Sequence, residues 1–254
     1  MTTTGSSSAP APPPPLGLDS RPTSVGSHRV VRFDLYGRGY SDRPKVRYDV
    51  ELFKRQIFEL TAALGMRAPL NLVALAFGAP IAIMIAEENP EQVKSLSFVA
   101  PDGLGVKMSF AAKIGYLPGV GETMLRVAGD RLLLSRLPEY SDDKDLVSRL
   151  AEHFEPTFGI KGFRRGLLSS IRNIPLHRAK ASYKAVGESD IPVCVLWGDK
   201  DVITPFKNAE LMRRLLPASE FHSMPDVGHL PQYERPQETL EIISGFLERT
   251  TENA

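Results

Sequence analysis

Two side chains that could serve acyl transfer follow predicted strands of this sequence. Asp201 closes the turn Leu196–Asp201, directly after one predicted strand, and His229 lies in Asp226–Pro231, after the last one. A carboxylate that orients a histidine lets the histidine act as a general base toward a nucleophile. Because loops after parallel strands gather at one edge of a sheet, we expect both side chains at the same edge.

A third segment, Val73–Pro80, has the composition of a sharp strand-to-helix turn. Small residues at Ala74, Ala76 and Gly78 let a strand turn into a helix without side-chain collision. This pattern is typical of a nucleophile elbow, which usually reads Gly-x-Ser-x-Gly. Ala76 stands at the nucleophile position, and its methyl group has no lone pair with which to attack a carbonyl. The segment therefore predicts an acyl-transfer site whose nucleophile is replaced.

Other carboxylates and hydroxyls of the chain are alternative candidates for the acid and the nucleophile. Asp199 rivals Asp201, and Asp102 follows another predicted strand, although a helix-capping role suits Asp102 better. No other serine falls in an elbow, because these residues lie inside a predicted strand or helix: Ser95, Ser97, Ser169 and Ser170.

The elements that must position these residues alternate between strands and helices. Asp49 is predicted to cap an amphipathic helix in which apolar residues recur at three- and four-residue steps. Further helices are expected at Phe77–Asn89, Pro205–Leu216 and Pro236–Arg249. Strands are expected at Arg29–Asp34, Leu70–Leu75, Lys94–Ala100, Pro192–Trp197 and Glu220–Met224. This alternation predicts an α/β fold, with a mostly parallel sheet wrapped by helices on both faces.

The strand pattern stops between Asp102 and Ser189, where the sequence favours helices. We expect residues 103–189 to form a helical cap, with residues 29–102 and 190–254 as the α/β core. Such an insert would cover the carboxyl edge of the sheet, where open α/β sheets bind ligands. Arg164 and Arg165 could meet an anionic substrate there, although a solvated helix face is the simpler interpretation.

Residues 1–28 differ in composition from the rest, being rich in proline, serine and threonine. With little apolar surface to bury, this segment is expected to form a disordered tail. It has no basic stretch followed by an apolar core, which argues against an ordinary secretory signal.

Composition excludes several classes of partner and site. A formal net charge of +1 argues against nucleic acid and acidic membranes, and the longest apolar runs are too short to span a bilayer. Cys194 is the single cysteine, so we expect no disulfide and a reducing, cytoplasmic compartment. No cofactor or metal is expected, because four histidines have no spaced partners: His28, His153, His177 and His222.

Four motifs, taken in order, resemble those of the α/β-hydrolase superfamily. Asp34–Pro44 resembles its Asp-x-x-Gly-x-Gly-x-Ser loop, and Asn89–Val93 resembles the turn after its elbow helix. The motifs Gly198–Asp201 and Gly228–His229 match its acid and histidine loops in the order elbow, acid, histidine. The branch most resembled contains carboxylesterases, monoacylglycerol-lipase-like enzymes and carbon–carbon-bond hydrolases.

The resemblance implies roles for particular residues. Asp201 would be the triad acid and His229 the base, Ala76 would occupy the position of the nucleophilic serine, and the backbone N–H of Phe77 would be one oxyanion donor. Members of this family begin with three further strands, and the loop after the third supplies the second oxyanion donor. Nothing before Arg29 resembles them. We therefore expect the Arg29–Asp34 and Leu70–Leu75 strands either to pair directly or to expose unpaired edges.

Two functions remain open from the sequence. The first is a serine ester hydrolase scaffold of the esterase or lipase type, acting on a small apolar ester or acyl compound, and inactive or strongly impaired as written. The second is a non-catalytic pseudoenzyme or small-molecule binding module that uses the capped pocket. The oligomeric state, the substrate, and whether Ala76 is native or engineered are all left open by the sequence.

Overall fold

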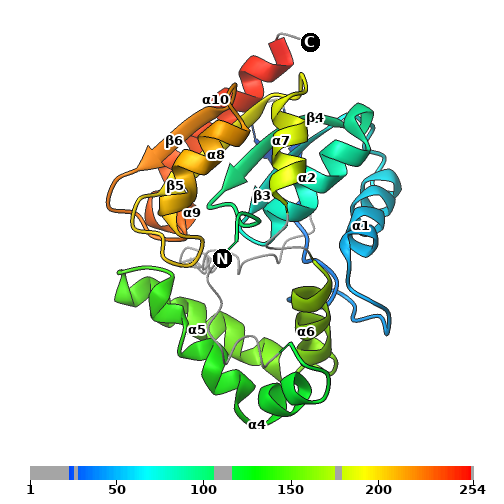
Figure 1. The fold of residues 1–254 in the computed structure, drawn as a ribbon, viewed down its shortest axis with the longest axis vertical. Coiled ribbons are helices and arrows are strands. Elements are labelled where there is room, and N and C mark those ends of the chain that lie inside the picture. The colour runs from blue at the N-terminus through cyan, green and yellow to red at the C-terminus, as the bar shows by residue number, and fades with distance from the viewer. Residues whose placement is uncertain (1–22, 26–27, 106–115, 175–178, 253–254) are drawn as a thin grey trace, which may run out of the picture.

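The computed structural model describes residues 23–25, 28–105, 116–174 and 179–252. Its centre is a four-stranded parallel sheet in the order β3 (Leu70–Leu75), β4 (Val93–Val99), β5 (Val193–Gly198) and β6 (Glu220–Met224) (Figure 1). These strands match four of the five that the sequence predicts. The α/β class and the parallel arrangement are confirmed.

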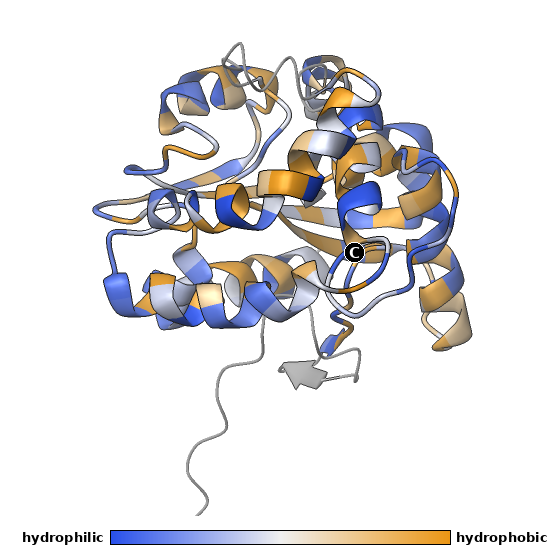
Figure 2. Ribbon diagram, turned by 90° about the horizontal axis from the view of Figure 1, so that it is seen from below, coloured by the Kyte–Doolittle hydropathy of each residue, from blue (hydrophilic) through white to orange (hydrophobic). Residues whose placement is uncertain are grey.

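Helices cover both faces of this sheet, with bounds α1 (Val50–Ala63), α2 (Gly78–Glu88), α7 (Lys180–Gly187), α8 (Ala209–Leu215) and α10 (Pro236–Glu252). Successive residues of β5 point to opposite faces. Val195 packs in the cluster that includes α2, α7 and α8, whereas Leu196 packs with Ile242 and Ile243 of α10. Orange and blue turns alternate along the helices in Figure 2, as expected for helices that bury one side.

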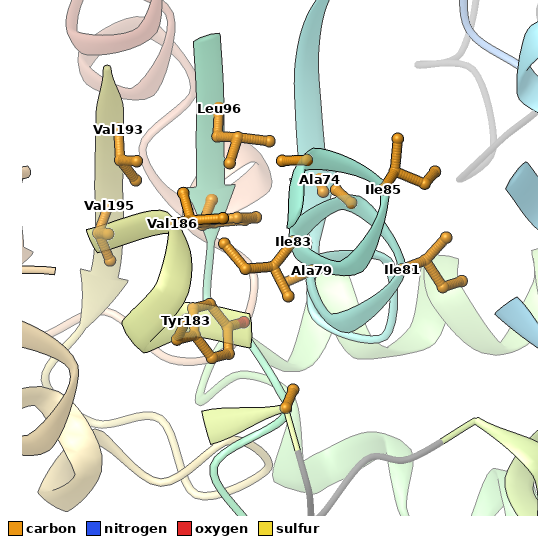
Figure 3. Packing of buried hydrophobic residues seen from close by; sticks show 14 of the residues in the cluster. Ala74, Ala79, Ile81, Ile83, Ile85, Leu96, Tyr183, Val186, Val193 and Val195 are labelled. Carbon is orange, nitrogen blue, oxygen red and sulfur yellow. The ribbon is translucent and has the colours of Figure 1, made fainter. Parts of the chain in front are cut away.

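The main core cluster fixes α2, the helix that follows the predicted elbow. Ala79 and Ile83 of α2 are fully buried, and Figure 3 shows them beside Tyr183 and Val186 of α7. Small residues on α2 allow close packing, and the isoleucines fill the space around them. The turn before α2 is therefore anchored by the main core cluster.

Helix α1 begins where the sequence predicts. The Asp49 side chain accepts a hydrogen bond from the Leu52 N–H at 3.1 Å, which satisfies one of the free amides of the first turn. The apolar side of the helix faces the core through the buried residues Leu52 and Phe53.

Replacing Asp49 by alanine should lower the free energy of unfolding by about 1 kcal/mol, the usual loss for an N-cap. Urea titration would measure it. Glu59→Ala is a suitable control, because Glu59 makes only an exposed pair with Arg55 at 4.0 Å, and such pairs contribute little. Equal losses in both variants would contradict the capping role.

The prediction of a strand at Arg29–Asp34 is wrong. The structure has a short strand, β2 (His28–Val30), paired antiparallel with β1 (Thr23–Val25) in a separate two-stranded sheet. After β2 the chain bends into a loop, because Gln56 of α1 binds it. Gln56 Nε2 donates to the Asp34 carbonyl at 3.0 Å, and the Tyr36 N–H donates to Gln56 Oε1 at 2.9 Å.

Part of the segment 1–28, for which the sequence predicts a disordered tail, takes part in this pairing. Thr23–Val25 and His28 are held by backbone hydrogen bonds between β1 and β2, which composition alone does not reveal. The rest of the predicted tail, residues 1–22 and 26–27, lies outside the described residues.

Strand β3 is a terminal strand of the main sheet. No strand in the described part of the chain pairs with its outer edge. The side chain of Val73, in the middle of β3, is 54% exposed although it is apolar. Of the two arrangements expected from the sequence, the structure therefore has the unpaired edge.

Three helices of the central region, α4 (Val120–Leu134), α5 (Lys144–Phe158) and α6 (Phe163–Asn173), lie apart from the sheet in a layer of their own (Figure 1). Leu146 and Leu150 of α5 belong to one buried cluster with Leu230, which follows β6, and Leu75 at the carboxyl end of β3 packs against this cluster. Helix α7 instead packs in the main core. Of the predicted cap range 103–189, the segment Lys180–Gly187 thus packs with the α/β elements.

Short helices complete the described chain: η1 (Pro90–Gln92), η2 (Leu137–Glu139), η3 (Phe206–Asn208) and α9 (Pro231–Glu234).

Candidate active site

Ala76 lies at a sharp turn between β3 and α2. Its φ is +43°, in the left-handed region that residues with a side chain rarely adopt. Backbone hydrogen bonds hold it there: the Ala76 N–H donates to the Val99 carbonyl at 3.0 Å, and the Asp102 N–H donates to the Ala76 carbonyl at 3.2 Å. Position 76 therefore has the strained, fixed backbone expected of an elbow.

Replacing Ala76 by glycine should raise the free energy of unfolding by about 0.5 kcal/mol. Glycine removes the strain of an alanine in the left-handed region, which stabilises the folded state by about 1–2 kcal/mol. Glycine also gives the unfolded chain more conformational freedom, which opposes folding by about 0.5–1 kcal/mol, so the net effect is stabilising. Ala79→Gly, inside α2, should have the opposite sign, with a loss of about 1 kcal/mol. Chemical denaturation of both variants would measure the difference, and a loss of stability in both would argue against strain at position 76.

Asp201 and His229 form a buried hydrogen-bonded pair after β5 and β6. Asp201 Oδ2 lies 2.8 Å from His229 Nδ1, and the two residues are only 3% and 2% exposed. An ionised carboxylate can only accept, so the His229 Nδ1–H donates to it and Nε2 is left as an acceptor. This arrangement fixes the imidazole in the tautomer that a general base requires.

The Asp201 carboxylate is held by further donors that the sequence analysis did not single out. The N–H groups of Ile203 and Thr204 donate to Oδ1 at 2.9 and 3.0 Å. The Thr204 hydroxyl lies 2.7 Å and the Trp197 Nε1–H 3.2 Å from Oδ2. An aspartate that accepts from amides two and three residues on forms a local turn, so Asp201-x-x-Thr204 could have been recognised from sequence.

The segment between α4 and α5 contributes to the position of His229 through Tyr140, which directly follows η2. The Tyr140 carbonyl accepts from the His229 N–H at 2.9 Å, and the two rings meet edge to face with centroids 5.3 Å apart. Desolvation by burial raises the pKa of the Tyr140 hydroxyl. The histidine is thus placed by Tyr140 as well as by the sheet.

Rival carboxylates have structural roles. Asp199 Oδ1 accepts from the Asp226 N–H at 2.8 Å, and Asp102 Oδ1 accepts from the Gly103 N–H at 2.7 Å. Both bonds shape loops at the carboxyl edge of the sheet. Ser95 and Ser97 lie in β4, and Ser169 and Ser170 in α6, so none of these serines replaces the missing nucleophile.

Among the residues described, no group of three His, Cys, Asp or Glu side chains could hold a metal ion. His153 Nδ1 lies 2.6 Å from the Arg149 carbonyl, within its own helix, and His177 falls outside the described ranges. Cys194 is buried in β5, and desolvation raises the pKa of its thiol to about 12.

The loop that begins at Asp34 reaches the elbow. Asp34 Oδ2 accepts from the Tyr40 N–H at 2.9 Å, and a Cβ at Gly39 would lie only 1.9 Å from this carboxylate. The glycine therefore permits the loop to close tightly. Closure places the Arg38 guanidinium over the ring of Phe77, 4.1 Å from its centroid. The loop is recognisable from the sequence motif, but the position of Arg38 against Phe77 is not.

Arg164 and Arg165 of α6, the candidate anion contacts, are engaged within the protein. Arg164 Nη2 lies 2.6 Å from Asp130 Oδ1, and Arg165 donates to the carbonyls of Pro44 and Arg43 at 2.8 and 2.7 Å. These contacts tie α6 to α4 and to the Asp34 loop.

No helix within the described ranges has both the length and the apolar character needed to cross a membrane.

Comparison with known proteins extends over most of the chain. The chain is 26% identical over 250 residues to a 2-hydroxymuconate semialdehyde hydrolase of Pseudomonas putida, covering 94% of this chain and 84% of that protein. It is 25% identical over 231 residues to lipase 1 of Psychrobacter immobilis, covering 87% of this chain and 69% of the lipase. A thermophilic esterase from Thermogutta terrifontis has a similar fold, with a TM-score of 0.72 at 21% identity over 87% of this chain and 80% of the esterase.

A family model described as alpha/beta hydrolase fold matches residues 13–236. That range takes in the strained turn at Ala76 and the Asp201–His229 pair, in the order that the sequence motifs indicated. The chain belongs to the alpha/beta hydrolase family.

Proposed function

We propose that this chain is a serine ester hydrolase scaffold, of the esterase or lipase type, in which Ala76 occupies the place of the nucleophile. The observation that carries the proposal is the buried Asp201–His229 hydrogen bond of 2.8 Å, in a chain whose elbow residue is held at a φ of +43°. Nucleophilic catalysis uses a base with a fixed tautomer together with a strained turn. Both features lower the stability of the folded state.

The residues would divide the work as follows. With serine at position 76, His229 Nε2 would take the hydroxyl proton while Oγ attacks the ester carbonyl, and the imidazolium would then protonate the leaving alcohol. Asp201 would stabilise the imidazolium. The N–H of Phe77, just before α2, would donate to the oxyanion. With alanine at position 76, no attacking atom is present, so the chain as it stands would be inactive or strongly impaired.

We propose that α4, α5 and α6 act as the cap over this site and that the remaining α/β elements, including α7, form the core. Leu146 and Leu150 support this division, because they share one apolar cluster with Leu230, and Leu75 packs against that cluster. The substrate would be a small ester or acyl compound enclosed between cap and core. The single buried cysteine, Cys194, supports a reducing, cytoplasmic location.

A second candidate is a non-catalytic protein that binds a small ligand in the same place. Ala76 itself favours this function, because the residue is fixed by neighbours and yet offers no chemistry. The two functions make opposite predictions for a single substitution. Restoring serine at position 76, then measuring hydrolysis of p-nitrophenyl butyrate and covalent labelling by an organophosphonate, distinguishes them.

A further inference from the structure

Arg38 lies against the residue that follows the nucleophile position. The carbon atom of its guanidinium is 4.1 Å from the ring centroid of Phe77 and 5.9 Å from that of Phe53. Nη1 donates to Ser170 Oγ of α6 at 3.0 Å. The cation is thus enclosed by the elbow, by α1 and by the cap layer.

Among the described residues, no carboxylate pairs with the charge of Arg38. No carboxylate oxygen of a described residue lies within 4.0 Å of the guanidinium, whereas Arg164 and Arg172 pair with Asp130 and Glu122 at 2.6 and 2.5 Å. Desolvation by burial lowers the pKa of Arg38 to about 10. An enclosed cation without a counter-charge is unfavourable, so its retention here calls for a reason.

Most N–H groups of the Arg38 guanidinium make no hydrogen bond to a described residue. Ser170 receives the one hydrogen bond that the side chain makes to a described residue. The Nε atoms of Arg43 and Arg164 are sealed in the interior without a partner, but no nitrogen of Arg38 is sealed in this way. The guanidinium therefore keeps N–H groups that have no partner among the described residues and are not closed off from a ligand. A guanidinium offers a planar fork of donors that matches a carboxylate.

We propose that Arg38 binds the carboxylate of an anionic ligand whose acyl portion lies at Ala76. This inference rests on the proposed function and specifies its substrate class: esters or acyl compounds that carry a free carboxylate. Phe77 links the position of the acyl group to that of the carboxylate. Its backbone adjoins Ala76, and its ring contacts the Arg38 guanidinium. Arg38 would thereby select anionic over neutral substrates of the same shape.

The test uses the chain as it stands, because binding needs no nucleophile. Phenylacetate and phenylacetamide are nearly isosteric and differ in charge, and isothermal titration calorimetry would give both affinities. We expect phenylacetate to bind at least about 10-fold more tightly, and Arg38→Gln to remove this preference. Arg213→Gln is the matched control, because it also deletes a guanidinium that stacks on an aromatic ring, 3.9 Å from the centroid of Phe221. This control should keep the preference.

A preference that survives in Arg38→Gln, or no preference in the unaltered chain, would overturn the proposal. Should Arg38→Gln fail to fold, the unaltered chain still decides the question: phenylacetate must shift the guanidinium NMR resonances of Arg38, and phenylacetamide must leave them in place. The probes are not hydrolysed. An anion preference combined with a failed serine rescue would therefore refute the hydrolase and leave the Arg38 site standing.

Discussion

Replacing Ala76 by serine should raise the rate of p-nitrophenyl butyrate hydrolysis about 1,000-fold over the chain as it stands. Loss of a triad nucleophile costs about 10⁶-fold in a complete serine hydrolase. An oxyanion hole that lacks one donor costs about 10²–10³-fold. We identify one donor, the N–H of Phe77. The expected gain is therefore the roughly 10⁶-fold effect of the nucleophile divided by the upper estimate for the missing donor, about 10³-fold. A fluorophosphonate should label Ser at this position and should leave the Ala76 protein unlabelled.

Two further changes in the Ala76→Ser background identify the base and its orienting group. His229→Ala removes the proton acceptor, and Asp201→Asn removes the carboxylate that fixes the His229 tautomer, a change that costs about 10⁴-fold in a complete triad. Both should return hydrolysis to the level of the Ala76 chain. A rate in Ala76→Ser that equals the starting rate, with no labelling in a folded variant, would refute the hydrolase and favour the ligand-binding function.

Replacing Trp197 by alanine should lower the free energy of unfolding by about 3–5 kcal/mol, the usual loss for a large buried aromatic side chain. Trp197 is 0% exposed and meets Phe206 edge to face with centroids 6.1 Å apart. Its Nε1–H also donates to the Thr204 carbonyl at 2.9 Å and approaches Asp201 Oδ2 at 3.2 Å. The substitution therefore removes core volume and a support of the Asp201 turn together.

Trp197→Phe separates the two contributions. It keeps most of the ring volume and deletes the Nε1–H, so we expect a smaller loss, of about 1–2 kcal/mol, from the unpaired Thr204 carbonyl and the reduced packing. Urea denaturation followed by circular dichroism would measure both variants. Equal losses for Trp197→Ala and Trp197→Phe would show that the hydrogen bonds, and not the packing, dominate.

The main sheet could be predicted because each of its strands is a short apolar run bounded by a turn. Leu70–Leu75 and Glu220–Met224 were located to the residue, and the side chain of Asp49 identified the start of α1. These signals are local, since burial of an apolar run and capping of a helix depend on neighbours in the sequence.

The failures concern partners that are distant in sequence. Arg29–Asp34 has a strand-like composition, yet Gln56 binds the Asp34 carbonyl and turns the segment into a loop. Tyr183 and Val186 of α7 pack in the main core, a contact that the helical composition of residues 103–189 does not reveal. Neither contact leaves a trace in local periodicity.

In the candidate site, too, the sequence order of the motifs is predictive, whereas contacts between residues far apart in sequence are not. The order of Ala76, Asp201 and His229 along the chain indicated a shared site, and the structure brings Asp201 and His229 together. The orientation of His229 Nε2 toward Ala76 stays a prediction. Tyr140 and Arg38 were missed because each acts through a contact with a residue far away in sequence.

The outer edge of β3 has a consequence for how this protein behaves in concentrated solution. Its six residues include neither a charge nor a proline, the usual means by which proteins protect a terminal strand from their neighbours. Such an edge is a template on which another extended chain can align and polymerise. Loss of protein to aggregation during purification and storage should then depend more steeply on protein concentration than on thermal stability. A single lysine in place of the exposed Val73 is the simplest remedy, because charge repulsion opposes stacking at the edge without disturbing the buried face.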